Sequence, residues 1–321
     1  MKFNLDVLKI DPVKELEKLS EFIVRQVKAV YRRKGVVIGL SGGIDSACIA
    51  AVAVYALGKD KVLGLVLPEK ESNPISSEYA IKHAQSLGIE YHKIDITPTV
   101  DSVVPYNWRD EFMQKLIPEY KRGYKYNITL PTDLLERDAF SLYFLQVQMP
   151  DGEIKKKRLN LEEFRTITSF ANIKIRSRML HLYSHAERRN LVVTGTTNRT
   201  EFILGDFCKY GDGGTDIEPL SYLYKNQIYQ LSEYLKIIPE IINRQPSPDT
   251  FSLPVRDQEF FFRIPFDKLD YLLYAWEHGI AANEVGKVLD LSEDAVRRAY
   301  KDFTSKNSAT AHLRELPHTV E

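Results

Sequence analysis

A hexapeptide at residues 41–46, with the sequence SGGIDS, constrains this chain more than any other feature. It follows apolar residues 36–40, which predict a buried parallel strand, and precedes apolar residues 47–57, which predict a buried helix. A strand, a glycine-rich turn and a helix N-terminus form an anion site, because free backbone N–H groups point at the ligand and the helix dipole favours negative charge. The serine hydroxyls add donors, and Asp45 can hold a metal ion that bridges phosphates.

This loop differs from two common phosphate-binding loops. It lacks the Gly-Lys-Ser/Thr ending of the Walker type, and it is not the dinucleotide GxGxxG. It resembles the SGGxDS loop of the ATP pyrophosphatases, which bind the pyrophosphate half of ATP and release it while adenylating a substrate. The alternative is an ordinary strand-to-helix turn rich in serine and glycine. The order of strand, turn and helix favours the nucleotide site.

Length and composition limit the class of protein. A chain of 321 residues can form one large α/β domain or two modest ones. Its 44 basic and 44 acidic residues give zero formal net charge, which argues against a general polyanion binder, although a local basic groove stays possible. Two cysteines form no disulfide framework, the N-terminus lacks an apolar signal core, and no stretch approaches the ~20 apolar residues of a membrane span. We expect a soluble cytoplasmic protein with no membrane and no nucleic-acid partner.

Strands and helices alternate along the first hundred residues. Apolar runs predict strands, and helical spacing of apolar positions predicts helices between them; the ranges are 11–34, 44–57 and 77–86 for helices and 36–40, 61–67 and 91–96 for strands. This alternation predicts an α/β fold with a doubly wound, mostly parallel sheet and flanking helices. Ligands of such sheets bind at the carboxyl ends of the strands, where loops 41–46 and 68–74 lie.

Residues 105–160 interrupt this alternation. Residues 144–149 and 153–159 flank a Pro-Asp-Gly turn and predict a β-hairpin. The basic run at 155–158 is typical of a solvated edge strand, with a nucleic-acid contact as the alternative. The pattern then resumes with a helix at 175–187, a strand at 191–194 and a helix at 225–235.

The C-terminal part is predicted to be helical. Residues 281–300 predict two short helices, with Ser292 as the N-cap of the second. The pair could be a DNA-reading helix-turn-helix, but the second helix begins with acidic residues, which favours packing against the catalytic domain. We expect one domain over residues 1–321, with 105–160 as an insertion and 265–321 as a helical extension packed on it.

A second polar constellation follows strand 191–194. Residues 195–201 again form a turn that opens a helix, so Glu201 can meet a metal ion held by Asp45, and Mg²⁺ commonly takes one or two carboxylates plus phosphate oxygens. The alternative is that Glu201 is simply a first-turn acid favoured by the helix dipole. Residues 207–216 form a glycine-rich polar loop, a candidate lid, and Lys225 could neutralise charge on a leaving pyrophosphate.

Four motifs, at residues 39–46, 172–176, 195–201 and 209–216, stand in the order found in ammonia-dependent NAD synthetases. The chain resembles that family over residues 10–104 and 165–318. The resemblance implies an ATP-dependent amide ligase that adenylates the carboxylate of nicotinic acid adenine dinucleotide with release of pyrophosphate. Ammonia then displaces AMP to give NAD. It also implies a homodimer.

The resemblance assigns roles to individual residues of this sequence. It implies ATP contacts by Gly39, Leu40, Ser41, Gly42, Gly43, Ile44, Asp45, Ser46, Thr196, Lys225 and Ser247. It implies Mg²⁺ ligands at Asp45 and Glu201, and acceptor contacts by Arg176, Lys209, Asp216 and His312. Asp45 and Lys225 would then serve catalysis directly. We add the hypothesis that Asp212 orients or deprotonates ammonium.

The sequence departs from the family pattern in the acceptor region. Leu313 stands where the pattern has a lysine, residues 247–249 read Ser-Pro-Asp where it has Ser/Thr-Ala-Asp/Gly, and residues 105–160 are longer than the usual connection. These departures leave open a same-fold ligase that amidates another carboxylate, in secondary metabolism or glycan modification. A tRNA-modifying adenylating enzyme and a non-enzymatic binding module are also compatible with the sequence.

The nitrogen source follows from the cysteines. A glutaminase needs a nucleophilic cysteine with a base, or an extra domain. Cys48 lies on an apolar helix, and Cys208 has no histidine near it in the sequence. We therefore expect free ammonia, or ammonia from a separate glutaminase partner.

Overall fold

The computed structural model describes residues 2–137, 142–245, 247 and 250–320. Its centre is a parallel four-stranded sheet in the order β3-β2-β1-β7, which confirms the predicted doubly wound α/β fold. The strands are β1 (Gly35–Gly39), β2 (Val62–Val66), β3 (Glu90–Lys93) and β7 (Leu191–Thr194). The loop at 41–46 therefore leaves a central strand, at the edge where such sheets bind ligands.

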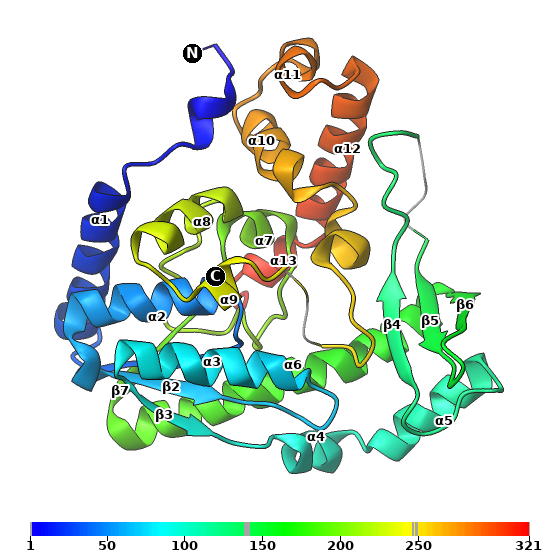
Figure 1. Ribbon diagram of the computed structural model, residues 1–321, viewed down its shortest axis with the longest axis horizontal. Coiled ribbons are helices and arrows are strands. Elements are labelled where there is room, and N and C mark those ends of the chain that lie inside the picture. The colour runs from blue at the N-terminus through cyan, green and yellow to red at the C-terminus, as the bar shows by residue number, and fades with distance from the viewer. Residues whose placement is uncertain (1, 138–141, 246, 248–249, 321) are drawn as a thin grey trace.

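Helices cover both faces of this sheet (Figure 1). Val36 and Ile38 of β1 join one apolar cluster and Val37 joins another, because successive side chains of a strand point to opposite faces. The first cluster includes α1 (Pro12–Arg25), α2 (Ile44–Leu57), α3 (Pro74–Leu87), α8 (Lys225–Tyr234) and α9 (Pro239–Ile242). The second includes α4 (Thr97–Val103), α5 (Tyr106–Leu116) and α6 (Leu161–Arg189).

Helix α6 is much longer than the helix predicted at 175–187. It begins with a capping box between Asn160 and Glu163 and ends at Asn190, which adopts a left-handed conformation with φ 60°. The first half buries Ile167 under a second, smaller sheet, whereas the second half buries Leu182 under the large sheet. No single apolar face runs the whole length, so helical periodicity alone did not reveal it.

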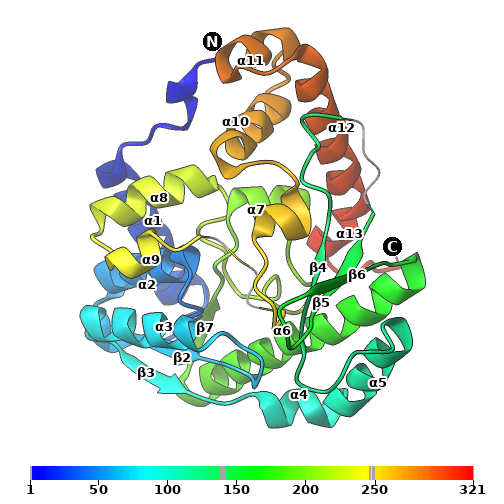
Figure 2. The ribbon, with the colours of Figure 1, turned by 45° about the vertical axis from the view of Figure 1, so that its right-hand side comes forward.

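The segment at 105–160 contains more structure than the predicted hairpin. The hairpin is confirmed as β5 (Phe144–Gln148) and β6 (Ile154–Arg158), and β4 (Lys125–Thr129) adds an unpredicted third antiparallel strand in the order β4-β5-β6 (Figure 2). Strand β6 is an edge, as predicted. Its Lys155 and Lys157 form ion pairs with Glu119 and Glu163. This sheet lies against the first half of α6 (Figure 2).

The C-terminal part is helical, as predicted. It comprises α10 (Phe266–Glu277), α11 (Ala282–Leu289), α12 (Glu293–Ala309) and α13 (Ala311–Arg314). The Ser292 hydroxyl accepts from the Ala295 N–H and caps α12, which confirms that signal. Val296 and Phe303 of α12 pack with Leu204 of α7 (Arg199–Leu204), so this helix pair buries its apolar face on the rest of the protein.

Short helical segments complete the chain: 3-10 turns at Leu5–Leu8 and Lys59–Lys61, and π-helical turns at Gln26–Val30 and Gln258–Phe262. Within the described ranges, no helix has the length and apolar character needed to cross a membrane.

Candidate active site

A cavity of about 810 Å³ opens at the carboxyl edge of the parallel sheet. Almost all the candidate residues line it: Gly39, Leu40, Ser41, Gly43, Ile44, Asp45, Ser46, Arg176, Thr196, Glu201, Lys209, Asp212, Lys225, Ser247 and His312. Gly42 and Asp216 do not line it. Segments that are far apart in the sequence, from β1 to α13, thus meet around one space.

The loop at 41–46 is shaped to bind an anion. The Ser46 hydroxyl accepts from the Ser41 N–H at 3.2 Å and donates to the Gly43 carbonyl at 3.0 Å. Helix α2 begins after Gly43 with no side-chain cap, so its first N–H groups are available to a ligand. Gly42 has φ +75°, and a Cβ there would lie 2.2 Å from the Ser76 carbonyl oxygen, so only glycine fits.

Asp45, Glu201 and Lys225 form a charged group directly beside this loop. The Lys225 ammonium contacts one Asp45 carboxylate oxygen and lies 3.9 Å from Glu201 Oε1. Burial alone would lower the pKa of Lys225, but Asp45 and Glu201 outweigh it and raise that pKa. Lys225 therefore stays positively charged at the place where the phosphates of a nucleotide would lie.

Glu201 both caps a helix and faces the charged group. It forms a capping box with Asn198 at the start of α7, in which its Oε2 accepts from the Asn198 N–H at 3.1 Å. Its other oxygen faces Lys225. Burial and the charge of Asp45 raise the pKa of Glu201, whereas Lys225 opposes that rise. Two carboxylates held this close repel each other, so a cation between them would relieve the repulsion.

The donor set fits Mg²⁺ completed by a ligand. Among the described residues, no group of three or more His, Cys, Asp or Glu side chains is arranged to hold a metal by itself. Asp45 and Glu201 supply two carboxylates, and Mg²⁺ sites of nucleotide enzymes typically combine one or two carboxylates with phosphate oxygens and water. The amide of Asn198 donates to Asp45 Oδ1 at 3.2 Å and orients that carboxylate.

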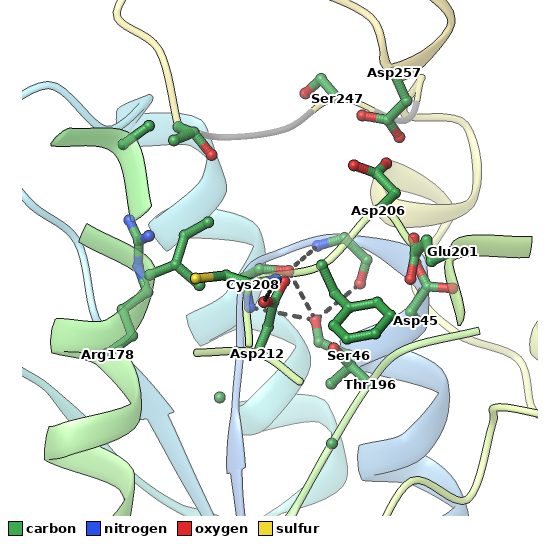
Figure 3. Close-up of a pocket in the computed structure, with 18 of the residues that line it drawn as sticks. Asp45, Ser46, Arg178, Thr196, Glu201, Asp206, Cys208, Asp212, Ser247 and Asp257 are labelled. Atoms are coloured by element: carbon green, nitrogen blue, oxygen red, sulfur yellow. Dashed lines mark hydrogen bonds between the residues drawn. The ribbon is translucent and has the colours of Figure 1, made fainter. Parts of the chain in front are cut away.

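Two further acids, which the sequence did not single out, face the same space. Asp206 and Asp257 lie opposite each other, next to Glu201 and Asp45 (Figure 3). Desolvation, together with Asp257 and Asp212, raises the pKa of Asp206 to about 8. Desolvation raises the pKa of Asp257 to about 6, although Lys225 opposes the rise. Asp206 therefore holds its proton at neutral pH, whereas Asp257 is mostly ionised there.

Asp212 is fixed within the loop at 207–216. Its Oδ1 accepts from the Cys208 N–H at 2.7 Å. Burial raises the pKa of Asp212, and backbone N–H donors only partly offset that rise. A Cβ at Gly213 would lie 2.3 Å from the Phe207 ring, so this glycine serves close packing of the turn.

Three residues expected to bind the acceptor are joined in a chain of hydrogen bonds. Arg176 Nε donates to the Lys209 carbonyl at 3.2 Å, and Lys209 Nζ donates to the His312 carbonyl at 2.6 Å. Leu313 also lines the cavity. Asp216 instead holds the end of β7: its Oδ2 accepts from the Val193 N–H at 2.8 Å.

Sequence reasoning missed other cavity residues. Arg244 donates to the Gly42 carbonyl at 3.3 Å and to the Ser76 hydroxyl at 2.8 Å, so it holds the loop at 41–46, called the phosphate loop below, against α3. Nothing in its local sequence indicates this, whereas the Asn-x-x-Glu pattern from Asn198 to Glu201 was a readable capping signal. Of the 247–249 segment, Ser247 lines the cavity, and Pro248 and Asp249 lie outside the described residues.

Comparisons with known proteins agree on one family. A family model described as NAD synthase matches residues 15–117 and 139–317. An NH(3)-dependent NAD(+) synthetase from Mesorhizobium japonicum is 39% identical over 311 residues, which cover 97% of each chain. The unmatched residues between the two parts of the family model, 118–138, contain β4.

Solved structures share the fold. The NMN synthetase from Francisella tularensis superposes with a TM-score of 0.67 at 22% identity, over 97% of this chain and 99% of that one. The NH3-dependent NAD synthetase from Campylobacter jejuni gives a TM-score of 0.64 at 24% identity, over 97% of this chain and all of that one.

Proposed function

This chain belongs to the NAD synthase family, and we propose that its cavity carries out the family's two-step amidation with the residues described above. The reaction is the ATP-dependent amidation of nicotinic acid adenine dinucleotide with ammonia. The observation that supports our assignment of residues is the convergence of the uncapped start of α2 with Lys225, Asp45 and Glu201 in one cavity.

The first step forms an acyl-adenylate. A carboxylate oxygen of the acceptor attacks the α-phosphorus of ATP, and the bond to the leaving pyrophosphate breaks. The hydroxyls of Ser41 and Ser46 and the first N–H groups of α2 bind the phosphates, and Lys225 neutralises charge on the pyrophosphate. When bound by Asp45 and Glu201, Mg²⁺ would supply further charge stabilisation to the phosphate oxygens.

The second step forms the amide. Ammonium must lose a proton before its nitrogen can attack the adenylate carbonyl, after which AMP leaves. Asp212 lines the cavity, and burial raises its pKa above the ordinary value, so this carboxylate accepts a proton more readily than an exposed aspartate does. We propose Asp212 as the group that orients or deprotonates ammonium.

We propose that the nitrogen arrives as free ammonia or from a separate glutaminase. Burial raises the pKa of Cys48 to about 12 and that of Cys208 to about 11, so both stay thiols and neither suits a glutaminase nucleophile. We also propose that residues 1–321 form a single domain and that the protein is a cytoplasmic homodimer. Light scattering at micromolar concentration tests whether it is a dimer.

The decisive experiment measures pyrophosphate release with ATP, Mg²⁺ and ammonium, with and without nicotinic acid adenine dinucleotide. Release that depends on the dinucleotide and matches amide formation supports the proposal and makes Leu313 a tolerated departure. If ATP binds but the dinucleotide triggers no release, the acceptor is a different carboxylate.

The Asp212→Asn variant tests the second step. An unchanged amidation rate at saturating ammonium would show that Asp212 does not orient or deprotonate ammonium.

A further inference from the structure

Helix α10 lies next to α7 and α8, the two helices whose first turns carry Glu201 and Lys225 (Figure 2). Two acidic side chains of α10, Asp270 and Glu277, are seven residues apart, which is about two helical turns, so they share one face of the helix. Each of them forms hydrogen bonds with the starts of both α7 and α8. We call these two acids and their hydrogen bonds the α10 brace.

Asp270 joins the residues that adjoin Glu201 and Lys225. Its Oδ1 accepts from the Thr200 hydroxyl at 2.7 Å, and its Oδ2 accepts from the Asn226 N–H at 2.7 Å. Thr200 directly precedes Glu201 in α7, and Asn226 directly follows Lys225 in α8. The Asn226 N–H belongs to the first turn of α8 and has no acceptor within its own helix, so Asp270 supplies an acceptor from a different helix.

Glu277 joins α7 and α8 in the same way. Arg199 Nε donates to Glu277 Oε2 at 3.0 Å, and Arg199 Nη2 donates to the other carboxylate oxygen. The Tyr224 hydroxyl also donates to Glu277 Oε2. Arg199 is the first residue of α7, and Tyr224 directly precedes Lys225. The α10 brace therefore holds α7 at the two residues before Glu201 and holds α8 on both sides of Lys225.

The buried carboxylate of Asp270 does something that an apolar side chain could not. Asp270 is only 2% exposed, and burial raises its pKa to about 6, so it is ionised at neutral pH. A buried charge costs free energy, which its hydrogen-bonded partners must offset, whereas apolar residues could pack α10 on its neighbours without that cost. Hydrogen bonds have a preferred distance and direction that apolar contacts lack, so the brace fixes how α7 and α8 lie relative to each other.

The charged group in the cavity depends on that relative placement. The Lys225 ammonium contacts Asp45 and lies 3.9 Å from Glu201 Oε1, although Glu201 and Lys225 belong to different helices. A displacement of about 1 Å in a catalytic site can cost about 100-fold in rate. Helix α7 has only six residues, too few to be stable by itself, so its position has to be set by contacts with other elements.

We propose that Asp270 and Glu277 are positioning residues, which set the placement of Glu201 and Lys225 in the active site. This inference rests on the proposed function, because it takes Glu201 as a metal ligand and Lys225 as the group that neutralises the pyrophosphate. Neither Asp270 nor Glu277 lines the cavity, so each acts through the helices that it holds. The C-terminal helical part thereby controls the geometry of the reaction from outside the cavity.

Pyrophosphate release by Asp270→Ala and Asp270→Asn tests the brace. Asp270→Ala loses both hydrogen bonds, so kcat should fall roughly 10- to 100-fold. The KM for ATP should stay within about 3-fold, because the phosphate loop is intact and the displaced charges act mainly on the pyrophosphate as it leaves. In Asp270→Asn the amide oxygen can accept from the Asn226 N–H and the amide nitrogen can donate to the Thr200 hydroxyl, so kcat should stay within about 3-fold of wild type.

Thermal unfolding gives a readout that does not depend on turnover. ATP alone should raise the melting temperature of Asp270→Ala as it does that of wild type. The further rise caused by Mg²⁺ should shrink, because Glu201 is then displaced from the ion. If Asp270→Ala does not fold, Thr200→Val takes its place. This variant breaks only the hydrogen bond next to Glu201, so kcat should fall by a smaller factor with the KM for ATP again unchanged.

Val285→Ala is the matched control. Val285 is fully buried on α11 in the apolar cluster that also contains α10 side chains, so its truncation loosens the C-terminal helices and leaves the brace in place. Equal losses of kcat in Val285→Ala and Asp270→Ala would overturn the proposal. So would a kcat within about 3-fold of wild type in folded Asp270→Ala, or an equal loss in Asp270→Asn. Failure of the proposed function is a different result, because wild type would then show no dinucleotide-dependent pyrophosphate release.

Discussion

Lys225 joins two carboxylates that would otherwise repel each other. Its ammonium contacts Asp45 and lies 3.9 Å from Glu201, beside the phosphate loop. We expect Lys225→Met to lower kcat about 100- to 1,000-fold, the effect of losing one preorganised electrostatic group. Pyrophosphate release measures the loss, and Lys287→Met on the exposed side of α11 is the control. Near-normal kcat in Lys225→Met would show that another group neutralises the leaving pyrophosphate.

Asp206 should make stability depend on pH. Its pKa is about 8 in the folded protein, whereas an unfolded aspartate titrates near 3.9. Between these values the folded state binds more protons, so the free energy of unfolding falls as pH rises from about 4 to about 8. Asp206→Asn cannot ionise, so its stability relative to wild type should increase through this window, by at most about 1.4 kcal/mol per pH unit, and level off above it.

Denaturant unfolding at a series of pH values measures the Asp206 effect. Asp60→Asn is the control, because Asp60 is exposed and far from the cavity in the short turn after α2. A difference between Asp206→Asn and wild type that stays flat from pH 4 to 8 would contradict the raised pKa.

At the scale of single residues, the sequence predicts site residues that belong to one contiguous motif. The loop at 41–46, Glu201 and Lys225 could be singled out from the sequence because each belongs to a short motif with its own strand or helix signal, and the structure brings them to one cavity. Arg244 and Asp206 were missed, because their roles arise only when segments far apart in sequence meet around the cavity. Asp216 illustrates the same limit: its carboxylate binds the β7 backbone, a contact that no local pattern indicates.

A buried ion cluster connects three segments of the chain to helix α6. The Lys174 side chain on α6 is fully buried and donates to Glu69 at 2.9 Å, Glu71 at 2.8 Å and the Thr250 carbonyl at 3.2 Å. Arg109 on α5 binds both oxygens of Glu71. The loop after β2, the 105–160 segment and the chain that follows α9 are thereby fastened to α6.

Removal of the Lys174 charge should destabilise the whole fold. Lys174→Met leaves buried carboxylates under-compensated, which typically costs about 3–5 kcal/mol in the free energy of unfolding. Denaturant unfolding measures this loss. Lys157→Met removes a partly exposed ion pair with Glu163 and should cost about 1 kcal/mol or less. Equal losses in the two variants would mean that the buried cluster contributes no more than a surface pair.

At the scale of elements, the sequence predicted the parallel sheet and the hairpin but not β4 or the first half of α6. Apolar runs predict the buried strands that lie between helices, and the Pro-Asp-Gly turn predicts the hairpin. Strand β4 reads KYNIT, in which only Tyr126 and Ile128 belong to the apolar core; two alternating positions are too short a pattern to predict a strand, and the strand's stability depends on pairing with β5. The stabilisation of such a short strand comes from pairing and packing with distant segments, which its local sequence does not indicate.

Elements from the whole length of the chain meet around one cavity. Residues from β1, α6, α7, α8, α13 and the chain near Ser247 line one cavity, so ligand binding should stabilise all of them together. By mass action, ATP at about 100 times its Kd adds about 2.7 kcal/mol to the free energy of unfolding. We expect Mg²⁺ to enlarge the ATP effect in wild type, because Asp45 and Glu201 can hold the ion only together with phosphate oxygens.

The Asp45→Asn variant separates the stabilisation by ATP alone from the additional stabilisation by Mg²⁺. It retains the serine hydroxyls, the N–H groups of α2 and Lys225, so ATP alone should still raise its melting temperature. The additional rise caused by Mg²⁺, and its reversal by a chelator, should disappear, whereas Asp60→Asn should keep both. Thermal unfolding with ATP, with ATP and Mg²⁺, and after chelation measures this. If Mg²⁺ raised the melting temperature of the ATP complex equally in wild type and Asp45→Asn, Asp45 would not be a metal ligand, and the ion would be bound by other groups.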